Sequence, residues 1–389
     1  MLLALNLAFK NLMGGRLRTI LNILILSFAF VIIIFFRGIM NGMDEQMSRA
    51  MIDEEIAGGQ YWVESYDPFD PLTLDEAYMN IPAEIQKLIN NGTAEQILLR
   101  PATIFPQGRD QNVILRGINP NQKLVTMPTI ALSSQLEFPL LIGKHMAKSS
   151  GLNVGDKIMI RWRDKHGAFD AKEGTIVSIM DTIVQTIDRG QIWMRISDLQ
   201  ELSGLPNEAT IILVDKNVPP ELITGWTFRS TDFLLSDVKS LVKTKQAGAV
   251  IMYALLLFLA MLAIFDTQVL AVFRRRKEIG TMIAMGMTRN RVIAIFTIEG
   301  ALNGVFAIIA GAILGYPLLR YFAVKGMSIY SAADDFGMAI PDRLYAYYSG
   351  QLIIGTTLLI FILVTIVSYL PTRKIAKLNP TEAIRGKIT

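Results

Sequence analysis

The sequence predicts an α-helical membrane protein with four transmembrane helices and a mixed α+β extracytoplasmic domain between spans one and two. Three observations lead to this fold class. The 389-residue chain is 51% hydrophobic, and its 19% of charged residues falls below the roughly 25% of an ordinary globular domain. The apolar residues gather into four long runs. Ordinary mixed sequence fills the long interval between the first run and the second, which indicates a folded domain there.

Each apolar run is long enough to cross a membrane, for which a helix needs about 20 mostly apolar residues. The first run is longer than the core of a secretory signal peptide, and no small-residue cleavage site follows it. It is therefore predicted to be a retained anchor, with a signal peptide as the alternative. The predicted spans are residues 19–40, 246–273, 292–324 and 351–371.

Lysine and arginine predict the orientation of the spans, because basic residues collect in the cytoplasmic segments of membrane proteins. Such clusters occupy residues 274–291 and the tail 372–389, and further basic residues precede the first span. Both termini are therefore predicted to be cytoplasmic, and residues 41–245 to be extracytoplasmic. The net charge of +4 is thus a topology signal, which argues against nucleic-acid binding. The loop 325–350, also predicted outside, carries Asp334, Asp335 and Asp342.

The domain of residues 41–245 reads as mixed α and β, because short β-type runs alternate with helical stretches and with Gly or Pro punctuation. The chain has no cysteine, which excludes disulfides, thiolate metal sites and a cysteine nucleophile. Strands are predicted around residues 61–63, 113–115, 158–160, 176–177 and 211–213. Helices are predicted at residues 82–89, 144–149 and 197–202.

Residues 1–18 predict an amphipathic helix that lies along the membrane surface. Their apolar side chains fall on one helix face, and a glycine pair then breaks the helix. The alternative is an ordinary start to the first span. The apolar face consists of Leu2, Leu5, Phe9 and Leu12.

The third span carries glycines that share one helix face and form two GxxxG pairs. Such a face lets another helix approach closely. We interpret it as a packing or dimerisation face, and chance occurrence in an apolar helix is the alternative. The glycines are Gly300, Gly304, Gly311 and Gly315.

Polar side chains inside a span are costly in lipid and often functional. Span two carries Asp266 and Gln268, and span three carries Glu299 together with Asn303. Asp266 and Glu299 both lie close in sequence to the basic segment 274–291. A hydrogen bond or ion pair at the membrane interface is therefore at least as good an interpretation as a substrate role.

The sequence offers no catalytic site and no metal site. It contains no GxxxxGK[ST] phosphate-binding loop, and His145 and His166 lack metal-ligand spacing. The carboxylates form no pair suited to acid–base work, and the run Asp53-Glu54-Glu55 is interpreted as a solvated face. The chain is therefore predicted not to be an enzyme.

The segment between spans two and three is the most specific motif. Basic residues stand at the membrane edge, and a short helix with one apolar face follows them. Residues 274–289 closely resemble the "RRREIGxLxAxG(M/A)" stretch of the FtsX-like/MacB-like ABC permeases, the mechanotransmission type (type VII). The apolar face consists of Ile279, Met282, Ile283, Gly286 and Met287.

In that family the segment is the coupling helix that docks into a groove on a separate ATPase subunit. The resemblance implies that ATP and Mg²⁺ are bound by that partner and that this chain holds no cofactor. Residues 274–277 would anchor the segment at anionic lipid. The ATPase-coupling residues that the resemblance implies are Arg275, Lys277, Glu278, Ile279, Gly280, Met282, Ile283, Gly286 and Met287.

Further motifs extend the resemblance along the chain. Residues 371–385 look like the family's "PxRxAxxxxPxEALR" ending, and Glu299-Gly300 matches an acidic residue and a glycine of its third span. Residues 113–120 and 141–158 resemble segments of its outer domain. Residues 40–46 are similar to the "MNGFexxl" stretch of lipoprotein-releasing permeases, the branch that this chain resembles most. The chain differs from macrolide exporters, which carry a fused ATPase, and from cell-division permeases, whose outer domain is smaller.

The resemblance implies a permease subunit of the bacterial inner membrane, paired with a second permease chain as a homo- or heterodimer. It would couple ATP hydrolysis by a separate ATPase subunit to extracytoplasmic movement or release of a hydrophobic cargo, with lipoprotein as the favoured cargo. One alternative is a regulatory permease that activates an outer partner such as a cell-wall hydrolase. Others are export of a small amphiphile and an anchored sensor or adhesion protein. The motifs do not name the cargo.

Overall fold

The computed structural model describes residues 16–328 and 343–375, and its chain divides into two compact units. We call them the helical unit (Met1–Met43, Val242–Met327 and Leu344–Thr389) and the sheet unit (Asp44–Leu241 and Ser328–Arg343). Most of the predicted interfacial helix of residues 1–18 lies outside the described residues. So do the three loop aspartates, Asp334, Asp335 and Asp342, and the C-terminal motif beyond residue 375.

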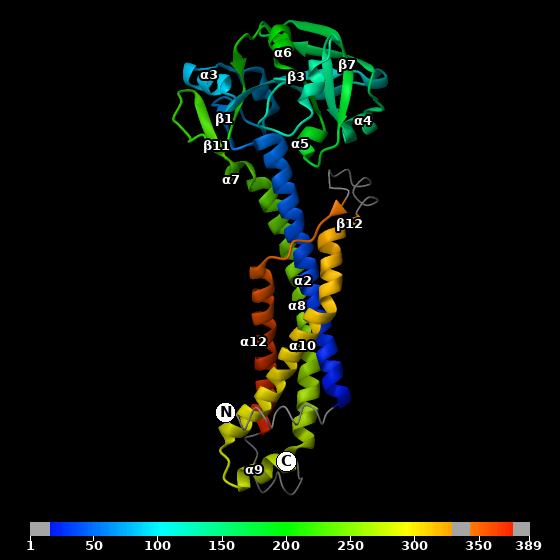
Figure 1. The fold of residues 1–389 in the computed structure, drawn as a ribbon, viewed down its shortest axis with the longest axis vertical. Coiled ribbons are helices and arrows are strands. Elements are labelled where there is room, and N and C mark those ends of the chain that lie inside the picture. The colour runs from blue at the N-terminus through cyan, green and yellow to red at the C-terminus, as the bar shows by residue number, and fades with distance from the viewer. Residues whose placement is uncertain (1–15, 329–342, 376–389) are drawn as a thin grey trace. The chain divides into compact units, whose positions relative to one another are not determined.

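Long helices carry the four apolar runs (Figure 1). Each contains a segment long and apolar enough to cross a membrane, with a mean hydropathy between 2.1 and 2.8. Their bounds exceed the predicted spans, because polar turns continue the helical hydrogen bonding beyond the apolar part. The helices are α2 (Arg16–Met51), α8 (Ser236–Arg274), α10 (Arg289–Lys325) and α12 (Gly350–Ile375), and the short α9 (Arg276–Ala284) connects α8 to α10.

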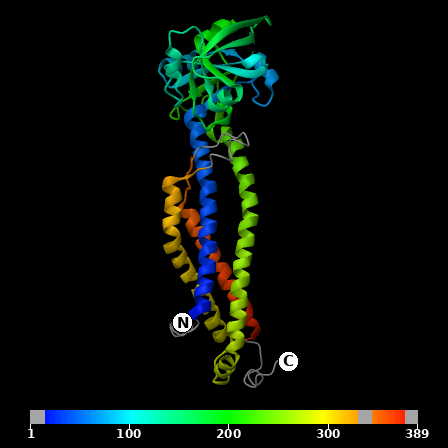
Figure 2. The same ribbon diagram turned by 90° about the vertical axis from the view of Figure 1, so that its right-hand side faces the viewer.

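One apolar cluster holds these long helices together within the helical unit. Helices α10 and α12 pack against each other where the first half of α10 meets the second half of α12 (Figures 1 and 2). Other faces of the helices expose large apolar side chains such as Ile313 and Leu358, as helices in contact with lipid do. The cluster includes Leu26 and Phe30 of α2, Leu257 and Ile264 of α8, Ala307 of α10, and Ile360 and Val364 of α12.

The sheet unit is built on one large mixed sheet. Its strands are β1 (Gly59–Val63), β3 (Ala94–Ile104), β4 (Gln111–Ile118), β5 (Pro139–Gly143), β6 (Lys157–Arg163), β7 (Phe169–Met180), β8 (Gln191–Arg195), β10 (Ile211–Val214) and β11 (Trp226–Ser230). They follow the order β11-β1-β10-β3-β4-β8-β5-β7-β6, and β3 pairs with β6 as well. This extra pairing closes the strands from β3 to β6 into a ring. Within it, β4–β8 and β5–β7 are parallel.

An apolar core fills the ring, to which each of its strands contributes. Alternate residues of β6 are buried, as the two-residue period of a strand requires. A second core lies around Trp62, Leu99 and Trp193. The ring core includes Leu98, Leu115, Leu140, Ile160, Ile176 and Ile192.

Short elements complete the sheet unit. The predicted strand runs fall in β1, β4, β6, β7 and β10, and the three predicted helices coincide with α3 (Ala83–Asn90), α4 (Lys144–Ser150) and α6 (Ile196–Ser203). Further helices are α5 (Gln185–Asp188), α7 (Thr231–Leu234), the π-helix η1 (Ile52–Ile56) and the 3₁₀ turns η2 (Pro71–Asp75), η3 (Pro106–Gly108) and η4 (Thr129–Ser133). Two-residue strands are β2 (Met79–Asn80), β9 (Glu208–Ala209), β12 (Met327–Ser328) and β13 (Arg343–Leu344).

Candidate functional site

The segment of residues 274–291 contains the helix that its sequence predicts. Helix α9 is bounded by Arg275, which is not helical, and it ends at Met285. Gly286 follows with a φ of +93°, a backbone conformation that L side chains rarely adopt. A Cβ at Gly286 would meet nothing within 4 Å. The backbone conformation, and not a lack of space, therefore requires glycine at this helix end.

The apolar face of α9 packs inside the chain, which corrects its expected role as a docking face. Ile279 is 2% exposed and belongs to a buried cluster with Val292 and Phe296 of α10. Met282, Ile283 and Met287 pack against the same cluster, and Gly280 is also buried. Helical spacing identified the stripe correctly, but the spacing cannot tell which surface the stripe covers.

The opposite surface of the segment is the one left for a partner. Met285 is 76% exposed and is a large apolar side chain on this surface. Because it falls outside the buried stripe, the sequence argument missed it. The exposed residues of the segment include Lys277, Glu278, Thr281, Ala284, Met285 and Gly286.

Arg275 connects α9 to α10. Its Nε donates to Oε2 of Glu278 at 2.9 Å, and its Nη1 lies 3.0 Å from Oε2 of Glu299. Its guanidinium also stacks on the Phe296 ring, 5.0 Å from the ring centre. The Arg275 and Glu299 side chains are 21% and 13% exposed. Glu299 thus takes part in an ion pair, one of the two interpretations that the sequence left open.

The other polar groups of the spans differ in their surroundings. Gln268 is 6% exposed, whereas Asp266 is exposed on α8. Asn303 donates its amide to the backbone carbonyl of Glu299 at 3.2 Å. A contact that the sequence argument missed joins α2 to α8, where Asn22 Nδ2 donates to Thr267 Oγ1 at 2.8 Å. An asparagine within an apolar run was the signal that could have found it.

The glycine face of α10 packs against two helices of the same chain. A Cβ at Gly300 would lie 2.1 Å from Ser368 Oγ of α12, and one at Gly304 would lie 3.3 Å from Val364. The later pair faces α2 instead. There, a Cβ at Gly311 would lie 2.8 Å from the Phe30 ring, and one at Gly315 would lie 2.6 Å from Val31. The stripe therefore serves packing within the chain.

In the acidic run after α2, Asp53 is exposed as the sequence suggested, but Glu54 and Glu55 are turned away from solvent. Glu55 is 11% exposed and forms an ion pair of 3.2 Å with Arg116 of β4. It also accepts a hydrogen bond of 2.5 Å from Thr186. Glu54 accepts one from Thr182. The π-helix turns these side chains toward the sheet. The sequence shows only a run of acidic residues and does not reveal this direction.

Arg116 ties this acidic run to the core of the sheet unit. Its guanidinium lies 5.0 Å from the centre of the Trp193 ring, and Trp193 is 1% exposed. A charged side chain held between a carboxylate and a buried aromatic ring is fixed in position. We call the contacts of Glu54 and Glu55 with Thr182, Thr186 and Arg116 the η1 joint.

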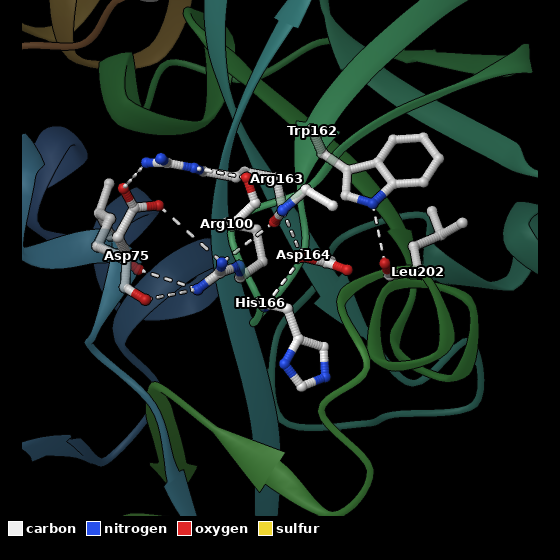
Figure 3. A network of polar contacts seen from close by, with 10 residues as sticks. Asp75, Arg100, Trp162, Arg163, Asp164, His166 and Leu202 are labelled. Atoms are coloured by element: carbon white, nitrogen blue, oxygen red, sulfur yellow. Dashed lines mark hydrogen bonds and ion pairs between the residues drawn. The ribbon is translucent and has the colours of Figure 1, made fainter.

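A second polar network in the sheet unit is structural (Figure 3). Arg100 is 1% exposed, and its guanidinium donates to the carbonyls of Asp75 at 3.0 Å and of Arg163 at 3.2 Å. Burial lowers the pKa of Arg100, opposed by the nearby Asp75 carboxylate. Asp164 accepts backbone N–H bonds within its own turn, including that of His166 at 2.9 Å. The network thus joins η2 to the β6–β7 turn through backbone carbonyls and the Asp75 carboxylate.

The sheet unit also contains a large cleft of about 1520 Å³. Its lining combines aromatic rings with cations. The Arg229 guanidinium lies 5.4 Å from the centre of the Trp62 ring and 4.7 Å from that of Phe233. Across residues 16–328 and 343–375, no three His, Cys, Asp or Glu side chains are grouped so that they could hold a metal ion. The lining also carries carboxylates such as Glu64 and Asp237, so the cleft suits an amphiphilic ligand or segment with charged groups.

Comparison with known proteins gives matches over both units. Residues 250–380 match the family described as FtsX-like permease C-terminal. An uncharacterized ABC transporter permease of Methanocaldococcus jannaschii is 27% identical over 252 residues, which cover 61% of this chain and 58% of that protein. The lipoprotein-releasing system transmembrane protein LolC of Haemophilus influenzae is 23% identical over 396 residues, 95% of this chain and 94% of that protein. LolC of Neisseria meningitidis is 23% identical over 320 residues, 73% of this chain and 75% of that protein.

Proposed function

We propose, from the premise that this chain carries an FtsX-like permease domain and resembles lipoprotein-releasing permeases, that it is the membrane subunit of an ABC transporter. In this proposal a separate ATPase subunit binds ATP and Mg²⁺, and two permease chains pair. The complex moves or releases a hydrophobic cargo outside the membrane. The observation that carries the proposal is the attachment of α9 to α10 through Arg275, Glu299 and Phe296.

This attachment supports a coupling role because it makes α9 and α10 move together. A short helix on a flexible loop would absorb the displacement of a docked partner. Here the buried Ile279 and the Arg275–Glu299 pair fix α9 from two sides. The exposed face with Lys277 and Met285 then offers one charged and one apolar contact to an ATPase groove.

The packing of α10 supports transmission to the other long helices of the helical unit. Gly300 and Gly304 bring α10 close to α12, and Gly311 and Gly315 bring it close to α2. Close-packed helices have few alternative arrangements, so a displacement of one is passed to its neighbours. The chain continues from α2 into η1, where the η1 joint fastens it to β4 of the large sheet.

The cargo assignment rests on resemblance and on the character of the cleft. Two LolC proteins named above belong to lipoprotein-releasing systems, and we propose lipoprotein as the cargo of this chain. The aromatic and charged lining of the cleft supports an amphiphilic cargo. It would equally suit a small amphiphile, which is the second candidate.

We place the chain in the cytoplasmic membrane of a bacterium, with both termini and residues 274–291 in the cytoplasm. The basic residues of that segment support this orientation. The sheet unit would then face the outside.

The proposal is tested by purifying the tagged chain from its native host in a mild detergent and identifying its partners by mass spectrometry. We expect a P-loop ATPase in near-equal amount, together with an acylated protein if lipoprotein is the cargo. An ATPase with a wall hydrolase and no cargo would instead favour the regulatory alternative. Recovery of the chain without any ATPase, under conditions that preserve known complexes, would contradict the proposal.

A matched pair of variants locates the contact. Met285→Asp should remove the ATPase from the purified complex, because it places a charge on the exposed apolar contact. Met159→Asp makes the same change at a methionine that is 40% exposed on β6 and should leave the ATPase bound.

A further inference from the structure

A second cavity in the sheet unit, of about 420 Å³, lies beside α4 and shares Arg189 and Gly190 with the lining of the large cleft. Its volume falls within the range of roughly 300–1,000 Å³ that is usual for small-molecule sites. Residues from three parts of the chain line it, and none of them carries a carboxylate. They are Gln111 of β4, His145, Met146, Lys148 and Ser149 of α4, and Arg189 with Gly190 before β8.

Arg189 is the cation of this cavity that lacks a protein counterpart. Among the described residues no carboxylate lies within ion-pair distance of its guanidinium, and its Nε is buried without a hydrogen-bond partner. A buried donor left without a partner is costly, and a guanidinium presents its donors in a planar fork that matches oxyanions. The position of Arg189 thus calls for an anion that the protein itself does not supply.

Gln111 is oriented to add a donor. Its Oε1 accepts a hydrogen bond of 2.7 Å from the hydroxyl of Ser150. Because the acceptor end of the amide is occupied in this way, the amide nitrogen is the end left for a ligand.

His145 is held by a buried acid behind it. Asp188 is fully buried, accepts the backbone N–H of His145 at 2.9 Å, and contacts the imidazole Nδ1 with its other oxygen. The carboxylate at Nδ1 fixes the position of the imidazole ring beside the cavity. Asp188 is thereby committed to α4 and is not among the residues that line the cavity.

From this arrangement we infer that the cavity binds the phosphate group of a small organic phosphate, with Arg189 and Gln111 as its main ligands. A tetrahedral phosphate offers oxygens in several directions, which suits donors arriving from β4, α4 and the turn before β8. The cavity is several times larger than a phosphate ion, so the ligand carries an organic part. The same chemistry is found in a phospholipid headgroup and in a soluble phosphate ester.

The site is tested by isothermal titration of the full chain in a non-ionic detergent, with glycerol 3-phosphate and inorganic phosphate as probes. We expect saturable binding of glycerol 3-phosphate. Arg189→Gln should weaken it about tenfold or more, because a charge-assisted hydrogen bond is lost. Lys216→Gln removes one charge from an exposed position elsewhere in the sheet unit and should leave binding unchanged.

A second variant keeps the test decisive if Arg189→Gln does not fold. Gln111→Glu retains the oxygen that accepts from Ser150 but places a negative charge at the site, so it should abolish binding. All four tryptophans of the chain, Trp62, Trp162, Trp193 and Trp226, lie in the sheet unit, so their fluorescence checks that this unit is folded in each variant.

Comparison of the two probes tests the organic part of the ligand, and vesicles that contain phosphatidic acid, added as a third probe, distinguish the ligand sources. Tighter binding of glycerol 3-phosphate than of inorganic phosphate supports an organic phosphate, and equal binding would contradict it. Competition by the vesicles against glycerol 3-phosphate identifies a lipid headgroup, and no competition identifies a soluble ester. No saturation by either probe up to about 10 mM would overturn the inference. Unchanged binding in a folded Arg189→Gln or Gln111→Glu variant would overturn it as well.

Discussion

Arg275 and Glu299 form an ion pair, with 3.0 Å between Nη1 and Oε2, that joins the start of α9 to α10. The same guanidinium reaches Glu278 of α9 at 2.9 Å. One arginine therefore holds two carboxylates, of which one lies on the short helix and the other on a long apolar helix. Because both partners of the Arg275–Glu299 pair are largely shielded from water, removing one of them costs more than breaking an exposed pair.

Removing either partner should damage coupling. Under the proposed function, we expect Arg275→Gln and Glu299→Gln each to reduce ATP-driven cargo release by about tenfold, because each removes the ion pair that joins α9 to α10. The double variant should lose less than the two single losses added together. The measurement is the amount of cargo released per ATP hydrolysed, in proteoliposomes that contain the ATPase partner. A lower value in the single variants would support the role of the pair. Arg291→Gln, an exposed change of the same type, should have no effect, and equal damage from it would contradict the role of the pair.

The effect of a substitution at Gly286 should depend on whether the new residue adopts a positive φ, and not on the size of its side chain. Its φ of +93° disfavours β-branched residues, and no neighbouring atom would obstruct a side chain. Gly286→Val should therefore fray the end of α9 and lower the ratio of transport to ATP hydrolysis by about tenfold. Gly286→Asn should retain most of it, since asparagine accepts positive φ more readily. Equal activity of the two variants in the proteoliposome assay would argue against this explanation.

Gly300 should be far more sensitive than Gly355, although both lie in long apolar helices. A Cβ at Gly300 would collide with Ser368, whereas one at Gly355 would meet nothing within 4 Å. Gly300→Ala should lower the free energy of unfolding of the helical unit by about 1–3 kcal/mol, and Gly355→Ala should leave it nearly unchanged.

Because the chain has no cysteine, a single reporter can follow this unit. Ala307→Cys places a thiol at a fully buried position, and its reaction with a thiol-specific fluorophore on heating reports opening. If the thiol became exposed at the same temperature in both glycine variants, the packing role of Gly300 would be refuted.

Glu95 of β3 should make the stability of the sheet unit fall as pH rises. Burial raises the pKa of Glu95 from 4.5 to about 7. Between these values the folded state keeps a proton that the unfolded state has released. The stabilisation is therefore complete below about pH 4.5 and is lost as pH rises through 7, by up to about 3 kcal/mol.

Tryptophan fluorescence during denaturant unfolding at pH 5 and pH 8 measures this difference in the sheet unit. Glu95→Gln should flatten the pH dependence, and Glu84→Gln, at an exposed position of α3, should leave it in place. A pH dependence that persists in Glu95→Gln would assign the effect to another group.

The sequence was sufficient for features that depend on local pattern. Four apolar runs predicted four long apolar helices, and β-type runs such as residues 158–160 fall in strands. The helix of residues 276–284 followed from its spacing and its terminal glycine. Helical spacing also placed Gly300 and Gly304 on one face, but it could not say that this face meets α12.

Two interpretations failed because they required knowledge of what lies opposite a side chain. Ile279 was expected on a docking surface, yet it is buried against α10. Glu55 was expected in solvent, yet it is paired with Arg116, a residue far away in the chain. Neither partner is close enough in sequence for spacing or charge to reveal the contact.

The amino-acid sequence by itself determined the apolar runs, their flanking charges, and a motif between the second and third runs that resembles the coupling segment of FtsX-like permeases. These properties depend only on composition and on short-range periodicity, which can be read without knowing how the chain folds. Only the tertiary structure decided which surface of α9 is exposed, that Arg275 reaches Glu299, and that Arg189, Gln111 and His145 surround one cavity. The physical reason is that a side chain is buried or paired by residues far away in the sequence. Which distant segments come into contact depends on the packing of the whole chain.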